Sequence, residues 1–526
     1  MNWLGIGLAL TCATIGLDHA RAGDWPTFGH DPQRTGWARS ERTLSTENVS
    51  SLELKWKTQV ENEASLLGSL TAPVAAAGVT TSKGVRDVVF VAGKAGGVFA
   101  LDAATGELLW DWHPVNYALP TNVGLQGSVY CPNGVNATPT IDAATGILFT
   151  LAENGSLYGL DMGSGRVRFG PAQFVTPFAK PWSLNLVGTV VHTTLAQGCG
   201  GSLSGFYSMD ISDPHRPVVR QLLLSNTTTG GIWGRGGPVA GENGKVYGST
   251  ADGPFDRRAG DYSNAVVAAS LDELELVDYF LPKNHWELYR LDLDFGSASP
   301  VWFGWRDYSL LASGAKEGVL YLLDAEALGG MDHQTPLLEG IRLGNDPSSS
   351  TSFGIWGGLS TWRDNEGTTW LYVPVYGPPS EFAPEFERSY GPTPDGSVMA
   401  FRVEADVKTA KPQLAAAWMS QNFKVPEPVA LANGVAFVLA NGENVNQRAS
   451  VQDRQTKDNQ PALLYALDAS TGEELYNSGD AMGTWVHFSG LAISEGRVFA
   501  VDYDSTVYGF GLPQKGTSAG QQAAGR

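Results

Sequence analysis

A strand–turn–strand pattern recurs along the whole chain and constrains the fold more than any other feature. It is clearest at 96–110, where an alternating stretch is followed by an Asp-Ala-Ala-Thr-Gly turn at 102–106 and a second apolar stretch that ends at Trp110. No stretch shows sustained helical periodicity. Further copies, some close and some weaker, lie at 155–165, 205–210, 265–271, 318–324, 396–401, 464–472 and 506–510. Eight units of about four short strands predict an all-β fold, an eight-bladed β-propeller of four-stranded antiparallel blades.

The repeats change what the chain length implies. A chain of 526 residues would ordinarily suggest about two to four domains. Propeller blades instead bury their faces against one another, so one unit cannot stand alone. The 64 glycines fit the many tight turns that such blades require. We therefore expect a single propeller over 23–513, preceded by a leader at 1–22 and followed by a disordered tail at 514–526.

Charge and composition exclude several classes of protein. The chain has 35 Lys+Arg against 54 Asp+Glu and a net charge of −19, which is unsuited to a phosphate backbone and excludes nucleic-acid binding. With 42% hydrophobic residues it can bury a large core. No apolar run is long enough to span a bilayer, so we expect no membrane span.

The first 22 residues carry a pattern typical of export. An apolar stretch at 3–17 is followed by Ala20-Arg21-Ala22, a small-x-small cleavage pattern, which predicts a signal peptide and a periplasmic or secreted protein. The alternative is a buried N-terminal segment. After cleavage two cysteines would remain, Cys131 and Cys199; an oxidising compartment permits a disulfide, but the sequence does not show whether the two meet.

Several motifs resemble the pyrroloquinoline quinone (PQQ) dehydrogenases and their PQQ-like repeat relatives. The run Ala-Leu-Asp-Ala-x-Thr-Gly-x-x-Leu-Trp at 100–110 resembles their tryptophan-docking motif, in which the Trp docks on the next blade, and 466–475 matches it except that Tyr476 replaces the Trp. The segment 25–36 looks like the family's N-terminal strand. Similar order and spacing continue at 230–233, 250–253, 291–295 and 315–324. The resemblance implies a quinoprotein alcohol-dehydrogenase-like propeller.

The resemblance also implies a set of site residues. Trp233 would lie under PQQ, with Arg235 near a cofactor carboxylate. Asp252 would bind Ca²⁺. Asp294, with Asp292 as a close rival, would be the catalytic base, and Lys316 would contact the quinone oxygens. Each has an ordinary structural alternative: a blade-core tryptophan, turn or strand-end aspartates, and a solvated lysine.

Two family features are absent from the sequence. The vicinal cysteine pair that covers the cofactor is missing, since Cys131 stands alone in roughly that blade. The stretch 197–202, Gln-Gly-Cys-Gly-Gly-Ser, replaces the expected metal-binding glutamate. On the other hand, five aspartates cluster within about 45 residues, where a cation would offset their repulsion unless they are solvated loop charges: Asp252, Asp256, Asp261, Asp292 and Asp294.

Three functions compete. The leading one is an exported enzyme that uses PQQ and Ca²⁺ to oxidise an alcohol or polyol. Its electrons would pass to an external acceptor such as a cytochrome c, because no CxxCH haem site is present. The second is a non-catalytic propeller that binds a polymer, carbohydrate or protein through its proline-rich loops at 377–382 and 389–392. The third is an isomerase or lyase that uses the axial carboxylates without a quinone. His487, near Trp485, either lines the channel or packs in a blade.

Overall fold

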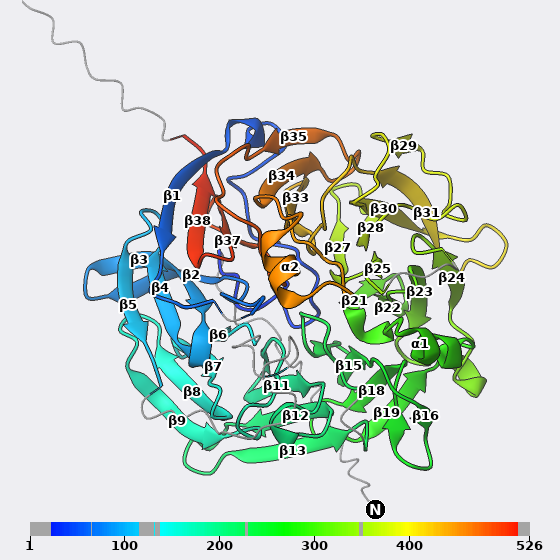
Figure 1. Ribbon diagram of the computed structural model, residues 1–526, viewed down its shortest axis with the longest axis horizontal. Coiled ribbons are helices and arrows are strands. Elements are labelled where there is room, and N and C mark those ends of the chain that lie inside the picture. Colours follow the sequence, from blue (N-terminus) through cyan, green and yellow to red (C-terminus); the bar gives the residue numbers. More distant parts are fainter. Residues whose placement is uncertain are drawn as a thin grey trace, which may run out of the picture.

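The computed structural model describes residues 23–64, 66–114, 131, 137–226, 230–346 and 351–513. The predicted signal peptide at 1–22 and the predicted tail at 514–526 lie outside the described residues. Eight β-sheets are arranged in chain order round a central axis, with the first strand of each nearest the axis (Figure 1). This confirms the predicted eight-bladed, all-β propeller of mostly four-stranded antiparallel sheets.

The strands of the blades follow one another along the chain. Blades 1 and 2 contain β2 (Val74–Thr81), β3 (Gly84–Ala92), β4 (Val98–Asp102) and β5 (Leu108–Trp112), then β6 (Thr140–Asp142), β7 (Ile147–Leu151), β8 (Ser156–Asp161) and β9 (Val167–Gln173). Blades 3 and 4 contain β10 (Asn185–Val187), β11 (Val190–Leu195), β12 (Gly205–Asp210) and β13 (Val218–Leu223), then β14 (Val239–Ala240), β15 (Lys245–Ser249), β18 (Val266–Ser270) and β19 (Leu276–Phe280).

The other four blades are similar except that blade 6 is larger. Blades 5 and 6 contain β21 (Val301–Trp305), β22 (Tyr308–Gly314), β23 (Val319–Asp324) and β24 (Leu338–Arg342), then β25 (Gly354–Ile355), β27 (Ser360–Arg363), β28 (Thr369–Tyr376), β29 (Arg388–Ser389), β30 (Gly396–Ala405) and β31 (Pro412–Met419). Blades 7 and 8 contain β32 (Ala430–Ala432), β33 (Val435–Ala440), β34 (Leu463–Asp468) and β35 (Glu474–Asn477), then β36 (Ala492–Ser494), β37 (Arg497–Val501), β38 (Thr506–Gly511) and β1 (Glu53–Gln59). Because β1 pairs with β38, strands from both ends of the chain close the ring.

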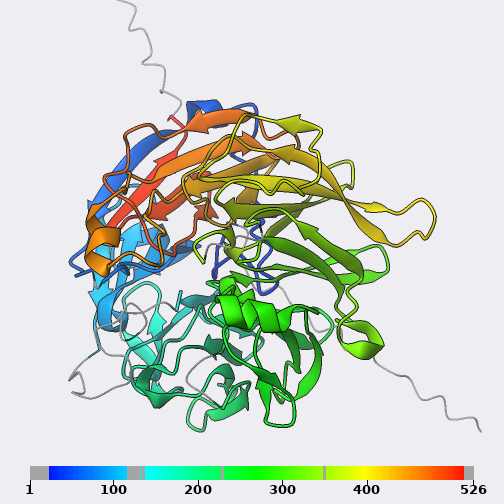
Figure 2. The ribbon, with the colours of Figure 1, turned by 45° about the vertical axis from the view of Figure 1, so that its right-hand side comes forward.

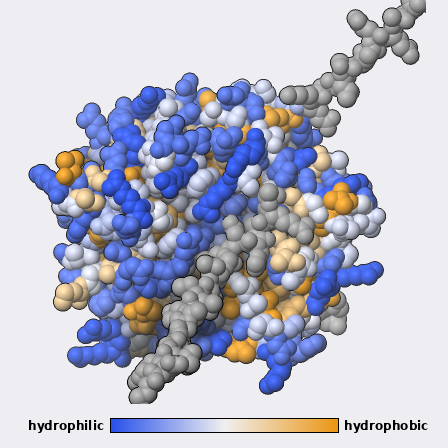
Figure 3. Space-filling view, turned by 180° about the vertical axis from the view of Figure 1, so that it is seen from behind, coloured by the Kyte–Doolittle hydropathy of each residue, from blue (hydrophilic) through white to orange (hydrophobic). Residues whose placement is uncertain are grey.

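A few short elements lie between the blade strands. They are the helices α1 (His285–Leu291) and α2 (Val451–Thr456), the hairpin β16 (Phe255–Asp256) and β17 (Asp261–Tyr262), the parallel pair β20 (Ala298–Ser299) and β26 (Gly357–Gly358), and 3-10 turns at Val49–Ser51, Lys94–Gly96, Cys199–Gly201, Phe295–Ser297 and Gly330–Asp332. Neither helix has the length and apolar character needed to cross a membrane. From behind, apolar side chains are scattered among hydrophilic ones where grey atoms do not cover the surface (Figure 3).

The sequence repeats correspond to one strand in each blade. All eight copies coincide with the third strand: β4, β8, β12, β18, β23, β30, β34 and β38. Tryptophans dock where the motif predicts: Trp110 Nε1 donates to the carbonyl of Met162 at 2.9 Å, in the next blade. A Cβ on Gly165 of that turn would lie 2.7 Å from the Trp110 ring, so the motif needs glycine there. Trp56 and Trp418 donate in the same way to Ala103 and Ala469.

The segment before the propeller, 23–38, passes round the ring and hydrogen-bonds to every blade in turn, at or next to its first strand; we call it the axial segment. The bonds include Trp25 to Ala75, Ile141 to Pro26, Thr27 to Leu184, Ala240 to Pro32, Trp302 to Gln33, Thr361 to Thr35, Leu431 to Gly36 and Ser494 to Gly23. It does not form the strand that the resemblance suggested. It makes only single bridges at Trp25 and Trp37, because glycines at 29 and 36 adopt positive φ and break the extended conformation.

One face of the ring carries the predicted site residues. In an antiparallel blade, the connection that enters the first strand and the connection between the second and third strands lie at the same end. We call the surface that these connections form the site face. The turned view in Figure 2 shows α1 and α2, which belong to such connections, on the side that faces the viewer.

Candidate axial site

The predicted site residues come from four neighbouring connections of the site face. Trp233 and Arg235 lie between β13 and β14, and Asp252 lies between β15 and β18. Asp292 and Asp294 follow α1, and Lys316 lies between β22 and β23. Blades 4 and 5 therefore bring together residues that are separated by up to about 80 positions in the sequence.

Three of the clustered aspartates meet in space and form an acidic triad. Asp252, Asp292 and Asp294 each offer a carboxylate oxygen within 4.8 Å of the others. Asp294 is buried and accepts two hydrogen bonds, one from the backbone N–H of Asp252 at 3.0 Å and one from Lys316 Nζ at 2.6 Å. Lys316, 3% exposed, also lies 3.9 Å from Asp292 Oδ1. The other two aspartates do not join the triad: Asp256 is exposed on β16, and Asp261 accepts the N–H of Asn226.

The triad carries more negative charge than its own residues neutralise. Three carboxylates face one ammonium group, Lys316, among the described residues. Burial, and then the Asp294 carboxylate, raise the pKa of Asp252 to about 6. The same two causes raise the pKa of Asp292 to about 6, although its side chain is the most exposed of the three. A divalent cation would remove this repulsion, and carboxylate oxygens are the ligands that Ca²⁺ prefers.

Beside the triad lies a set of stacked rings that we call the aromatic layer: Trp182, Trp233, Trp356, Tyr376 and Phe488. Trp233 packs edge-on against Trp356 with centroids 5.3 Å apart and is stacked with Phe488 at 6.2 Å. Lys316 Nζ lies 5.5 Å from the Trp233 ring centroid and 5.3 Å from that of Trp356. Lys316 therefore joins the acidic triad to the aromatic layer by an ion pair on one side and cation–π contacts on the other.

Arg235 does not reach the triad. Its guanidinium lies 4.2 Å from the Phe488 ring, donates to Tyr376 Oη at 2.7 Å and forms an ion pair with fully buried Glu427. Glu427 also accepts a hydrogen bond from Asn441 at 2.7 Å. The sequence analysis did not foresee Glu427, because it lies 192 positions after Arg235 and in no motif.

Two further residues near the layer were also missed. Lys180 is buried, its Nζ lies 5.4 Å from the Trp182 ring, and no described residue forms an ion pair or hydrogen bond with it. Burial lowers the pKa of Lys180 to about 7. Gln197 Oε1 is buried and has no hydrogen-bond partner among the described residues. Its neighbour Ala196 bridges Gly231, whose carbonyl accepts the N–H of the residue before Asp252. Gln197 lies in the stretch that replaces the expected metal-binding glutamate but was not predicted as a ligand, whereas a lone lysine such as Lys180 carries no sequence signal of this kind.

The two remaining cysteines, whose pairing the sequence left open, form a disulfide. Cys131, between β5 and β6, joins Cys199, between β11 and β12, with Cα atoms 5.5 Å apart. His487 lies at the aromatic layer as well: it stacks on Phe488 with centroids 3.8 Å apart, and its Nδ1 lies 2.7 Å from Glu443 Oε2. These contacts are those of a packed histidine, the second of the two interpretations of His487.

Part of the chain is similar to a known propeller family. Residues 25–175 match the PQQ family described as "Glucose/ethanol/alcohol dehydrogenase, beta-propeller domain". This stretch, which is under a third of the chain, is therefore similar to the propeller domain of that family. No curated protein sequence matches the chain.

Solved structures with a similar propeller include alcohol and methanol dehydrogenases. A europium-containing methanol dehydrogenase is 13% identical with a TM-score of 0.60, and the match covers 94% of this chain and 98% of the other. The quinohemoprotein alcohol dehydrogenase of Comamonas testosteroni is 14% identical with a TM-score of 0.57, and the match covers 94% of this chain and 81% of the other. At these identities the likeness shows the fold.

The acidic triad could hold a metal ion, and the groups beside it have the chemistry that a flat anionic cofactor would need. The acidic triad and the unpartnered amide oxygen of Gln197 are a hard-oxygen donor set. Trp233 offers an aromatic surface, and Lys180 is a buried cation without a described anionic partner. Arg235 is committed to Glu427, so it does not supply a free cation.

Proposed function

We propose that the axial site binds PQQ together with a divalent cation such as Ca²⁺ and oxidises an alcohol or polyol, passing electrons to an external acceptor such as a cytochrome c. The observation that carries the proposal is the acidic triad, with its oxygens within 4.8 Å of one another, beside a lysine that lies against two tryptophan rings. A carboxylate cluster, a cation and an aromatic surface are the parts that quinone-dependent alcohol oxidation needs.

Each residue has a role in this proposal. Bound PQQ would supply an ortho-quinone that accepts a hydride from the alcohol carbon. Asp252 and Asp292 hold the cation, with the Gln197 amide as a neutral ligand. Asp294 takes the hydroxyl proton as general base, and its carboxylate is oriented by the Asp252 N–H and by Lys316.

The remaining roles concern binding of the cofactor. Lys316 would donate a hydrogen bond to a quinone oxygen, and Trp233 would support the flat ring system. Lys180 replaces Arg235 as the cation for a cofactor carboxylate. The disulfide supports an oxidising compartment, and therefore the proposed signal peptide and periplasmic or secreted location.

The test is titration of the purified full chain with PQQ and Ca²⁺, followed by cofactor absorbance and by dye reduction with a panel of alcohols. We expect binding at micromolar PQQ and alcohol-dependent dye reduction. Asp252→Asn should weaken Ca²⁺ binding by about tenfold or more. Asp256→Asn, on the exposed β16 strand, is the matched control and should leave binding unchanged. Absence of PQQ binding would contradict the proposal. Full turnover of Asp294→Asn would overturn only the assignment of the base.

One observation favours the non-catalytic alternative, a propeller that binds a polymer, carbohydrate or protein. A cavity of about 820 Å³ opens beside the axial site and is lined in part by Pro378 and Pro379 of the proline-rich loop at 377–382. Under this alternative, the cavity would bind its ligand and no alcohol would reduce a dye in the presence of PQQ.

A further inference from the structure

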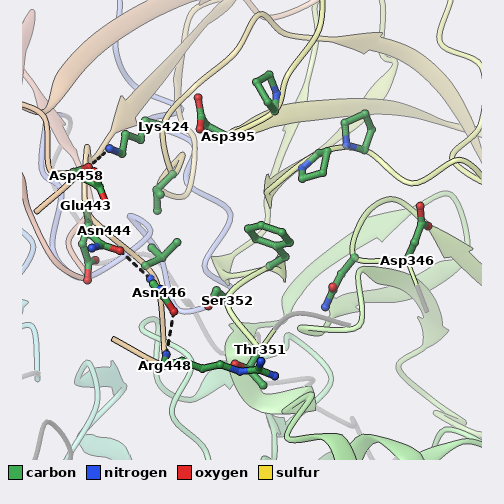
Figure 4. A pocket seen from close by; sticks show the side chains of 17 residues that line it. Asp346, Thr351, Ser352, Asp395, Lys424, Glu443, Asn444, Asn446, Arg448 and Asp458 are labelled. Atoms are coloured by element: carbon green, nitrogen blue, oxygen red, sulfur yellow. Dashed lines mark hydrogen bonds between the residues drawn. The ribbon is translucent and has the colours of Figure 1, made fainter. Parts of the chain in front are cut away.

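The cavity lies on the site face between blades 5, 6 and 7. Its lining comes from the connections before β25 and β32 and from those between β28 and β30 and between β33 and β34. Figure 4 places Lys424, Asn446 and Arg448 on one side of the opening and Asp346 on the other. A volume of about 820 Å³ is in the range of pockets that hold drug-sized ligands, so it exceeds what a small alcohol fills.

Several residues of the cavity wall contact residues of the axial site. Asn345, in its wall, donates to the backbone carbonyl of Lys316, and the carbonyl of Phe353 accepts the indole N–H of Trp356 at 2.9 Å. Val425, also in its wall, packs with the aromatic layer. Glu443 lines the cavity and binds His487, which stacks on Phe488. A ligand in the cavity would therefore lie beside the triad–lysine cluster.

The charges of the lining disfavour an anionic ligand. Four carboxylates line the cavity, those of Asp346, Asp395, Glu443 and Asp458, against two cations, Lys424 and Arg448. Glu443 is neutralised by Arg454, with an oxygen 2.5 Å from the guanidinium. The three remaining carboxylates still outnumber the two cations, so the field repels a phosphate or a carboxylate.

The remaining chemistry matches a ligand rich in hydroxyl groups. Phe353 and three prolines, Pro378, Pro379 and Pro394, provide flat apolar surfaces. Amide, carboxylate and guanidinium groups line the rest; carboxylates accept hydrogen bonds from hydroxyls, guanidinium groups donate to them, and amides do both. A purely apolar alcohol would leave these groups unpaired, at a cost in free energy.

We infer that this cavity binds an uncharged oligosaccharide, as the non-reacting part of a substrate whose terminal hydroxyl reaches the acidic triad. Reaction of the terminal hydroxyl at the acidic triad rests on the proposed function, whereas binding of the oligosaccharide in the cavity does not. Remote binding of this kind raises the occupancy of long substrates, so turnover at low substrate concentration should increase with chain length.

The first test uses the full chain without cofactor. Maltotriose, cellotriose and xylotriose are titrated by calorimetry, with trigalacturonate as a charged comparator. At least one neutral trisaccharide should bind, and trigalacturonate should bind at least about tenfold more weakly. Arg448→Ala and Asp395→Asn, both exposed and therefore harmless to folding, should weaken binding by about tenfold. Arg363→Ala, an exposed arginine on β27 outside this cavity, is the matched control.

The outcomes separate this inference from the proposed function. If no neutral trisaccharide binds, or if Arg448→Ala and Asp395→Asn both bind as the wild type does, the inference is wrong. If a trisaccharide binds but is not oxidised in the presence of PQQ, the proposed function is wrong, and so is the claim that the terminal hydroxyl reacts at the acidic triad. The cavity would still be an oligosaccharide site. If PQQ is reduced, Arg448→Ala should raise KM for the trisaccharide and leave KM for glycerol unchanged; equal effects on both substrates would contradict the inference.

Discussion

The axial segment and the site face both contain buried charged groups, but these groups differ in how many partners the chain supplies. In the axial segment, Arg34 is 3% exposed and makes three hydrogen bonds, to Thr27, to the carbonyl of Phe28 and to that of Leu184, at 2.8–3.0 Å. Asp31 accepts hydrogen bonds from Thr35, and Arg39 lies 3.4 Å away. On the site face, Lys180 has no described partner and three carboxylates face Lys316.

The difference indicates which buried charges stabilise the fold and which ones are suited to binding a ligand. The hydrogen bonds of the two terminal nitrogens of Arg34 hold the axial segment to the blades, although its Nε is buried without a described partner, and removing such a charge leaves a buried polar group unpaired. Charges without enough partners lower the stability of the free protein, and a ligand that supplies the missing charge recovers that stability. Substitutions in the two regions should therefore change stability in opposite directions.

The largest effect is expected in the axial segment. Arg34→Met removes three charge-assisted hydrogen bonds and leaves the buried carbonyl of Phe28 without its donor, while the Leu184 carbonyl keeps the Thr27 hydroxyl, so the free energy of unfolding should fall by about 3 kcal/mol. Chemical denaturation measures the change. Arg39→Ala, which removes a half-exposed side chain, is the control and should cost no more than about 1 kcal/mol. A loss as small as this in Arg34→Met would contradict the contrast between the regions.

The second effect is a dependence of cation binding on pH. Because the pKa of Asp252 and that of Asp292 are each raised to about 6, protons compete with the cation below that pH. Ca²⁺ affinity should therefore fall about ten- to a hundredfold between pH 7 and pH 5.

Linkage gives a matching prediction for stability. Between about pH 4 and pH 6 the triad binds more protons in the folded protein than in the unfolded chain. Without Ca²⁺, the triad's contribution to the free energy of unfolding therefore falls as pH rises. Thermal unfolding with and without Ca²⁺ checks both effects, and Asp256→Asn serves as control. A rise in Tm on adding Ca²⁺ that is the same at both pH values would contradict the prediction.

The sequence predicted the blades better than the site for a physical reason. Blade packing depends on local signals, such as Asp102 to Gly106, whose glycine accommodates Trp56 of the neighbouring blade. The order of the family motifs also placed Asp252, Asp294 and Lys316 close together. The partners of Arg235 and Lys180 depend instead on which loops meet across the ring. Glu427 satisfies Arg235 from a distant blade and nothing described satisfies Lys180, and neither fact leaves a local pattern.

The smallest effect also tests the contrast most directly, because its sign opposes that of Arg34. Burial lowers the pKa of Lys180 to about 7 from about 10.5, so near pH 8 the unfolded chain binds more protons than the folded one, and stability rises with pH. Lys180→Met removes this cost and should raise the Tm of the free protein, while it weakens PQQ binding by about tenfold. Lys180→Arg, which keeps a cation, should retain more of the affinity, and exposed Lys411→Met is the control. If Lys180→Met lowers Tm and leaves PQQ affinity unchanged, Lys180 is a packing residue like those of the axial segment.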